Sequence, residues 1–162
     1  MSPTVEPTSG RRGVSPLVGV VLLVAITVAI AAVVAASVGA WSLEPAGPTA
    51  AFDLEVDADR DEVLIDHVTG DAIDVTTLSV RVEVDGEPLA EQPPVPFVGA
   101  EGFYETPTGP FNAEAEPRWE PGERAGFRIA GTNDPTVEAG DRVTVRLVVD
   151  GRTIAELSAT AG

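Results

Sequence analysis

The stretch VSPLVGVVLLVAITVAIAAVVAASVGAWSL, residues 14–43, contains no charged residue and divides the chain into two unlike parts. At 1.5 Å per residue, a helix of this length is longer than the ~30 Å hydrocarbon core of a bilayer. Its apolar residues occupy every side of the helix, whereas a surface helix of a soluble protein keeps a polar face. The stretch therefore predicts one transmembrane or filament-forming α-helix, preceded by a leader at 1–13 and followed by a linker at 44–50.

The start of this stretch carries signals for a helix boundary and for orientation in a membrane. Ser15 is suited to cap the helix, and Pro16 is suited to its first position. Arg11 and Arg12 precede the apolar residues, and acidic residues follow them. Because positive flanks stay on the cytoplasmic side, we expect a single-pass protein in the cell membrane with a cytoplasmic N-terminus and an external C-terminal part.

Three kinds of protein begin with an apolar run of this type. A secretory signal peptide has an apolar region of only ~7–15 residues before its cleavage site. Cleavage after Ala40 would follow small residues, but the run before it is too long for that class. An uncleaved membrane anchor fits both the length and the flanking charge. The third kind is a prepilin, which loses its leader and keeps the apolar helix.

The segment RRGVSPLVGVVLLVAITVAIAAVV, residues 11–34, resembles the N-terminus of archaeal type IV pilins, in particular the haloarchaeal ones. In that family a prepilin peptidase cuts before the apolar segment, after a small residue that follows charged ones. The resemblance implies cleavage between Gly13 and Val14. Val18 stands at the fifth mature position, where many bacterial pilins carry Glu and archaeal ones commonly do not. A looser resemblance to the globular domains of archaeal pilins covers residues 63–82.

Small residues recur in the apolar stretch at a spacing that lets helix backbones approach one another closely. The candidates for this packing are Gly19, Ala25, Ala29, Ala32 and Ala36. Such residues are common in any membrane helix, so the spacing alone does not separate a filament helix from an anchor. Together with the resemblance, it implies three partners: membrane lipid, the prepilin peptidase with its pilus assembly machinery, and other pilin subunits.

The part of the chain after the apolar stretch is strongly acidic. Beyond Leu43 there are 25 acidic residues and eight arginines, and the whole chain has no lysine. Such a surface repels nucleic acid, because phosphate contacts need clustered basic residues. The acidic residues are spread evenly, so we interpret them as a solvated surface for high salt, where repulsion is screened within ~3 Å, and infer a halophilic source. A binding face for a cationic partner is the alternative.

From residue 51 onward, apolar residues alternate with polar ones, which is the pattern of half-buried β-strands. The clearest of the predicted strands cover residues 52–56, 62–68, 78–84, 126–130, 143–149 and 152–159. Asp85-Gly86 and Asp150-Gly151 lie between such runs, as two-residue hairpin turns do. About seven short strands predict a mainly β domain over 51–162. We expect a small extracellular β-sandwich, for which an immunoglobulin-like topology is one candidate; the cysteine and tryptophan hallmarks of true immunoglobulin domains are absent, so the topology stays open.

A stretch rich in proline and glycine, at about 91–122, holds most of the aromatic residues. They are Phe97, Phe103, Tyr104, Phe111 and Trp119. One interpretation is an exposed adhesive or subunit-contact face, since long loops in compact domains are often functional. The other, which we prefer, is a long loop whose aromatic side chains fold back over the sandwich.

Patterns for catalysis and metal binding are weak. The single histidine, His67, lies in a predicted strand, and no nucleophile-elbow sequence is present, so we interpret it as a structural or exposed strand residue. The absence of cysteine excludes thiolate nucleophiles and cysteine-based zinc sites. The alternating aspartates of residues 57–61 lack the glycine and final glutamate of a calcium loop. We therefore expect no enzyme, no catalytic residue and no cofactor.

These patterns together predict a type IV pilin-like subunit, cut after Gly13 and assembled through its helix into a surface filament, with adhesion as its expected role. The main alternative is a membrane-tethered extracellular binding domain that does not polymerise. A secreted protein cut after Ala40 is the third possibility. The position of the mature N-terminus separates the three kinds of processing.

Overall fold

The computed structural model describes residues 14–40 and 47–162, together with Pro3, and the helix and the β domain form two separate compact units. Helix α1 comprises Val14–Ala40. It begins one residue before Ser15, so Ser15 and Pro16 lie inside its first turn. Proline is tolerated there because the first N–H groups of a helix have no intrahelical partner. The expected helix end at 41–43 lies outside the described residues.

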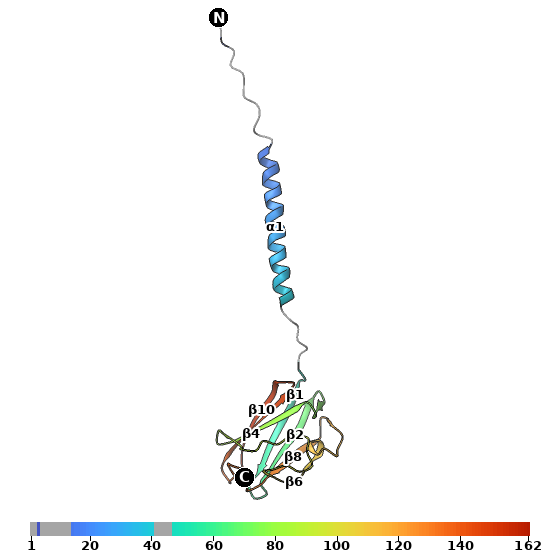
Figure 1. Ribbon diagram of the computed structural model, residues 1–162, viewed down its shortest axis with the longest axis vertical. Coiled ribbons are helices and arrows are strands. Elements are labelled where there is room, and N and C mark those ends of the chain that lie inside the picture. The colour runs from blue at the N-terminus through green and yellow to red at the C-terminus, as the bar shows by residue number, and fades with distance from the viewer. Residues whose placement is uncertain (1–2, 4–13, 41–46) are drawn as a thin grey trace. The chain divides into compact units, whose positions relative to one another are not determined.

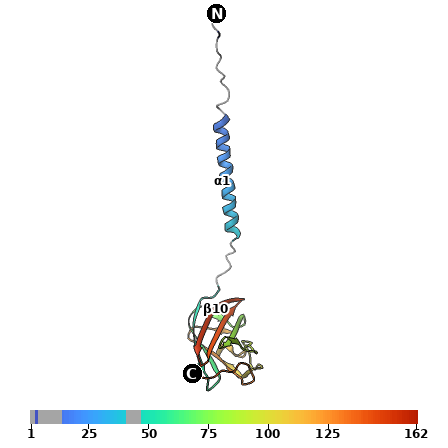
Figure 2. The same cartoon turned by 90° about the vertical axis from the view of Figure 1, so that its left-hand side faces the viewer.

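Residues 47–162 form a sandwich of two four-stranded antiparallel sheets (Figures 1 and 2). The first sheet has the order β1 (Ala50–Asp57), β2 (Glu62–Gly70), β8 (Arg124–Ile129) and β6 (Phe103–Thr108). The second has the order β10 (Arg152–Thr160), β9 (Arg142–Val149), β4 (Leu78–Val84) and β5 (Glu87–Pro88). The short strands β3 (Ile73–Asp74) and β7 (Arg118–Trp119) pair separately. The predicted fold class, one apolar helix followed by a β-sandwich, is confirmed.

The order of the strands is that of an immunoglobulin-like sandwich. Lettered along the chain without β3 and β7, the first sheet reads A-B-E-D and the second reads G-F-C-C′. The C′ position is filled only by β5, which pairs with the last two residues of β4. Most of β4 is therefore an open sheet edge, and this feature bears on the surface described below.

The core lies between the two sheets and follows the alternation of the sequence. Its centre consists of fully buried side chains, namely Val63 and Ile65 of β2, Val82 of β4, Val143, Val145 and Leu147 of β9, and Phe127 of β8. Burying each such side chain contributes about 1.5–3 kcal/mol. The two predicted hairpin turns are confirmed, because Asp85-Gly86 and Asp150-Gly151 all have positive φ, as type I′ turns require.

The expectation of one long loop at 91–122 was wrong. This segment contains β6, a 3₁₀ turn at Gly109–Phe111 and β7. Prolines and glycines within and beside β6 concealed it, since both residue types are depleted in strands. Four of the five aromatic side chains are at most 8% exposed and cover one part of the core, as we had preferred, whereas Tyr104 is 43% exposed. The linker was expected at residues 44–50, but β1 already begins at Ala50. Residues 44–46 lie outside the described part of the chain.

Candidate functional site

The surface of α1 is apolar and uncovered. Its large side chains from Leu17 to Val34 are each 50–66% exposed. By length and composition, the 22 residues Ser15–Ala36 are able to cross a membrane. Because exposed apolar area of this extent is unfavourable in water, the helix requires lipid or other helices around it.

The hydroxyl group of Thr27 is satisfied within the helix itself. Its Oγ1 donates a hydrogen bond to the carbonyl oxygen of Leu23 over 2.8 Å. A polar group in an apolar environment costs free energy unless it is hydrogen-bonded, so this internal bond suits a helix surrounded by lipid or by other helices.

Four of the five predicted packing residues lie on one side of α1. At 100° per residue, Ala25, Ala29, Ala32 and Ala36 fall within a sector of about 60°. Gly19 lies about 110° from the middle of that sector, so the helix does not bring it into the same stripe. A Cβ added at Gly19 would meet nothing within 4 Å, so α1 itself does not require a glycine there. We name the four alanines the alanine stripe.

Only one of the predicted processing residues lies in the described part of the chain. Val14 is the first residue of α1. Arg11, Arg12 and Gly13 lie outside the described part of the chain. The first mature residue expected from the sequence is therefore also the first residue of the helix.

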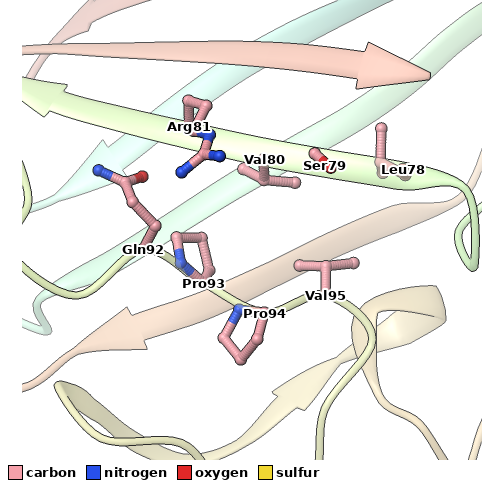
Figure 3. Close-up of a pocket in the computed structure, with 8 residues that line it drawn as sticks. All are labelled: Leu78, Ser79, Val80, Arg81, Gln92, Pro93, Pro94 and Val95. Carbon is pink, nitrogen blue, oxygen red and sulfur yellow. The ribbon is translucent and has the colours of Figure 1, made fainter. Parts of the chain in front are cut away.

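A small hollow lies beside the open edge of β4 (Figure 3). It has a volume of about 230 Å³ and lies between Leu78–Arg81 and the segment 92–95. The side chain of Gln92 binds the backbone groups of Val82 that a neighbouring strand would otherwise bind. Its Oε1 accepts a hydrogen bond from the N–H of Val82, and its Nε2 donates to the Val82 carbonyl. Pro93 and Pro94 have no N–H to offer. The segment thus blocks this edge without pairing with it, and the hollow is smaller than most small-molecule sites.

His67 belongs to the aromatic part of the core and is 1% exposed. Its Nδ1 lies 3.2 Å from the carbonyl oxygen of Trp119 and, since a carbonyl only accepts, must donate. Its Nε2 has no hydrogen-bond partner among the described residues. The rings of Phe52 and Trp119 lie 4.8 and 5.6 Å from the imidazole, so it is sealed from substrate and acts as a structural residue.

Several carboxylates of the sheets form ion pairs with arginines. Arg124 of β8 makes two hydrogen bonds of 2.7 Å to Asp66 of β2. These bonds lower the pKa of Asp66. Asp57 forms an ion pair with Arg60 in the turn after β1, in the segment of alternating aspartates, and also accepts a hydrogen bond from the backbone N–H of Arg60. Over residues 14–40 and 47–162, no group of three or more histidines or acidic residues is arranged to hold a metal ion.

Comparison with known proteins bears on the helix and the start of the domain. Residues 12–52 match the family model for the N-terminal part of archaeal type IV pilins. The match covers α1 and the first residues of β1, so this part of the chain is similar to the N-terminal part of archaeal type IV pilins, and the predicted resemblance is confirmed. Pilins of this family are structural filament subunits.

The chain is also similar to a protein of Archaeoglobus fulgidus that is described as uncharacterized. The two are 42% identical over 74 residues, which is 44% of this chain and 52% of the relative. The matched region thus spans about half the length of that relative.

Proposed function

We propose that this chain is a prepilin, that a prepilin peptidase cuts it between Gly13 and Val14, and that the mature subunit assembles through α1 into a surface filament. The observation that carries the proposal is the uncovered apolar helix in the segment that matches archaeal pilins. Because the proposed cut falls immediately before α1, the mature protein keeps the whole helix.

The same helix serves two environments in succession. In the membrane its apolar surface is covered by lipid, and the preceding arginines hold the N-terminus on the cytoplasmic side. In the filament the helices of other subunits replace the lipid. Lipid tails and the helices of other subunits are equally apolar, so the hydrophobic effect does not favour one over the other. Association then depends on close packing of helix backbones, which the alanine stripe supports.

The β-sandwich lies outside the cell in this scheme and forms the exposed surface of the filament. We propose that its role is adhesion, because a filament subunit presents this domain to the surroundings. Its acidic surface, with 24 carboxylates against eight arginines over residues 47–162, supports function in high salt, where repulsion between subunits is screened.

The alternative is a membrane-tethered binding domain that uses the same leader and helix but never polymerises. The exposed helix is compatible with both, because lipid alone is able to cover it. The two differ in where the mature chain is found.

The test is to shear surface filaments from cells that express the tagged chain and to compare filaments with membranes. Gly13→Asp, which removes the small residue before the proposed cut, is compared with Ser9→Ala in the same leader. We expect the wild type and Ser9→Ala in filaments and Gly13→Asp only in membranes. A wild-type chain that occurs in membranes and never in filaments would favour the tethered binding domain.

A further inference from the structure

The arginines of the β domain are not all paired, although carboxylates outnumber them three to one. Five of the eight form ion pairs, namely Arg60, Arg118, Arg124, Arg128 and Arg146. Arg152 also has an interaction partner. Arg81 and Arg142 are exposed, and their guanidinium groups form no ion pair with any residue of 14–40 or 47–162.

Both unpaired arginines lie on the same outer face. Arg81 alternates with buried residues of β4, and Arg142 with buried residues of β9. In the ladder between these strands, Arg81 is directly opposite Arg146. Like charges in that position repel each other, and only Arg146 is compensated, by Glu156 at 2.8 Å and Glu83 at 3.9 Å. We name the outer face of β4, β9 and β10, which bears Arg81, Arg142 and Arg146, the arginine face.

The arginine face differs in charge from the rest of the domain. Its three arginines are matched in number by Glu83, Asp85 and Glu156, whereas residues 47–162 as a whole carry three times as many carboxylates as arginines. The carboxylate of Asp85 accepts a hydrogen bond from the backbone N–H of Arg142 over 2.9 Å, so it is engaged by the main chain. This face is therefore less negative than the domain as a whole, so another acidic protein approaches it with less repulsion than the average charge of the domain suggests.

Each unpaired arginine also lines a hollow that contains hydroxyl groups. Arg81 borders the hollow of about 230 Å³, together with Ser79 (Figure 3). Arg142 borders an open hollow of about 480 Å³, together with Thr144, Thr160 and Asp85, whose Oδ1 already accepts the backbone N–H of Arg142. A guanidinium group beside hydroxyl donors is suited to receive a carboxylate.

We infer that the arginine face receives the acidic surface of a second copy of this chain, with Arg81 and Arg142 pairing with carboxylates of the neighbouring subunit. The inference rests on the proposed assembly of the chain and names the part of the domain that takes part in it. A second copy is the fitting occupant because its β domain offers carboxylates in excess, 24 of them against eight arginines over residues 47–162.

The contact is heterologous, because it joins the arginine face of one copy to a different, acidic surface of the next copy. A heterologous contact that does not close into a ring produces an open helical filament. Pairing between strand edges is blocked at β4 by Gln92 and the two prolines, so this contact uses the side chains of the sheet face.

The first test changes charge in the full-length chain in cells. Arg81→Glu/Arg142→Glu is compared with Arg60→Glu/Arg118→Glu, which makes the same change at two exposed arginines elsewhere. We expect the first variant to reach the membrane in normal amount. Its amount in filaments should fall at least about tenfold, because a loss of about 1.4 kcal/mol in binding free energy lowers the affinity tenfold. The control is expected to remain within about twofold of the wild type, because exposed ion pairs contribute little.

The second test uses the absence of lysine from the chain. Arg81→Lys keeps the charge and introduces the sole side-chain amine, which a carbodiimide couples to a carboxylate in contact with it. In filaments we expect covalent dimers and a ladder in Arg81→Lys, and none in the wild type. Peptide mapping then identifies the carboxylate of the neighbouring copy.

Two outcomes would overturn the inference while leaving the proposed function intact. One is that wild-type and Arg81→Glu/Arg142→Glu chains enter filaments equally. The other is that the lysine couples only within its own copy or to a different molecule, such as an acidic surface polymer. Absence of the wild type from filaments would instead refute assembly itself, and with it this contact.

Discussion

Nδ1 of His67 lies 3.2 Å from the carbonyl oxygen of Trp119 and links β2 to β7 inside the aromatic part of the core. The strand β2 belongs to the first sheet, whereas β7 belongs to the segment rich in proline and glycine. This contact therefore helps to hold that segment against the sandwich, together with the packing of Phe52 against both rings and the pairing of β6 with β8.

Replacing His67 should reveal how much this link stabilises the domain. We expect His67→Ala to lower the free energy of unfolding by about 3 kcal/mol, because it leaves a cavity among aromatic rings. His67→Phe should cost less, about 1–2 kcal/mol, because it fills the space but leaves the Trp119 carbonyl without a donor. Denaturant unfolding of the full-length chain in detergent measures both. The exposed neighbour Val68→Ala serves as the control, and an equal loss there would show that the link contributes nothing special.

The pair of Asp66 and Arg124 predicts a dependence of stability on pH. Arg124 lowers the pKa of Asp66 through two hydrogen bonds. The stabilisation is therefore present above the ordinary aspartate pKa of about 3.9 and is lost as the pH falls through the lowered value. At low salt, Asp66→Asn should be less stable than the wild type at pH 7, and the difference should disappear in strong acid. Asp59→Asn, in the turn after β1, is the control. A difference that grows toward low pH would contradict this account.

The alanine stripe predicts that the position of a bulky residue on α1 matters. Ala29→Leu adds the same volume as Ala31→Leu, but Ala31 lies about 130° from the middle of the stripe. We expect both variants to insert into the membrane normally, since leucine favours insertion. Only Ala29→Leu should lower the amount of chain in filaments, by obstructing close backbone approach. Equal filament yields for the two variants would show that the stripe is not the packing surface.

The backbone at Gly109, directly after β6, leaves no room for a side chain. Its φ is +62°, and a Cβ there would lie 2.1 Å from the carbonyl oxygen of Arg124 in β8. Gly151 also has positive φ, at +79°, but a Cβ there would meet nothing within 4 Å. Gly151→Ala should therefore cost only the backbone strain of about 1–2 kcal/mol. Gly109→Ala should cost clearly more in thermal unfolding, and a similar cost for both would mean that β6 shifts freely.

The sequence predicted those parts of the fold that depend on local patterns. Three such parts are the alternating strands β4 and β9, the two Asp-Gly turns and the uncharged helix. Each of them depends on residues that are close together in the sequence. The burial of His67 was also readable, because it continues the inward positions of Val63 and Ile65. Of the two interpretations left open for His67, structural or exposed, this phase in the strand favours the structural one.

Other features depend on residues that are distant in the sequence. The strand β6 was concealed by prolines and glycines and exists because β8 offers it an edge. The unpaired state of Arg81 and Arg142 could not be predicted, since each arginine has acidic neighbours in the sequence. Only the registers of β4, β9 and β10 decide which carboxylates it faces.

The central claim is that the apolar helix stays with the mature protein and that only the leader is removed. Intact-mass measurement and N-terminal sequencing of the native protein, taken from membranes and from filaments, test it most directly. The account predicts a single mature form that begins at Val14 in both fractions. A mature protein that begins at Trp41, or one that still carries Arg11 and Arg12, would contradict it.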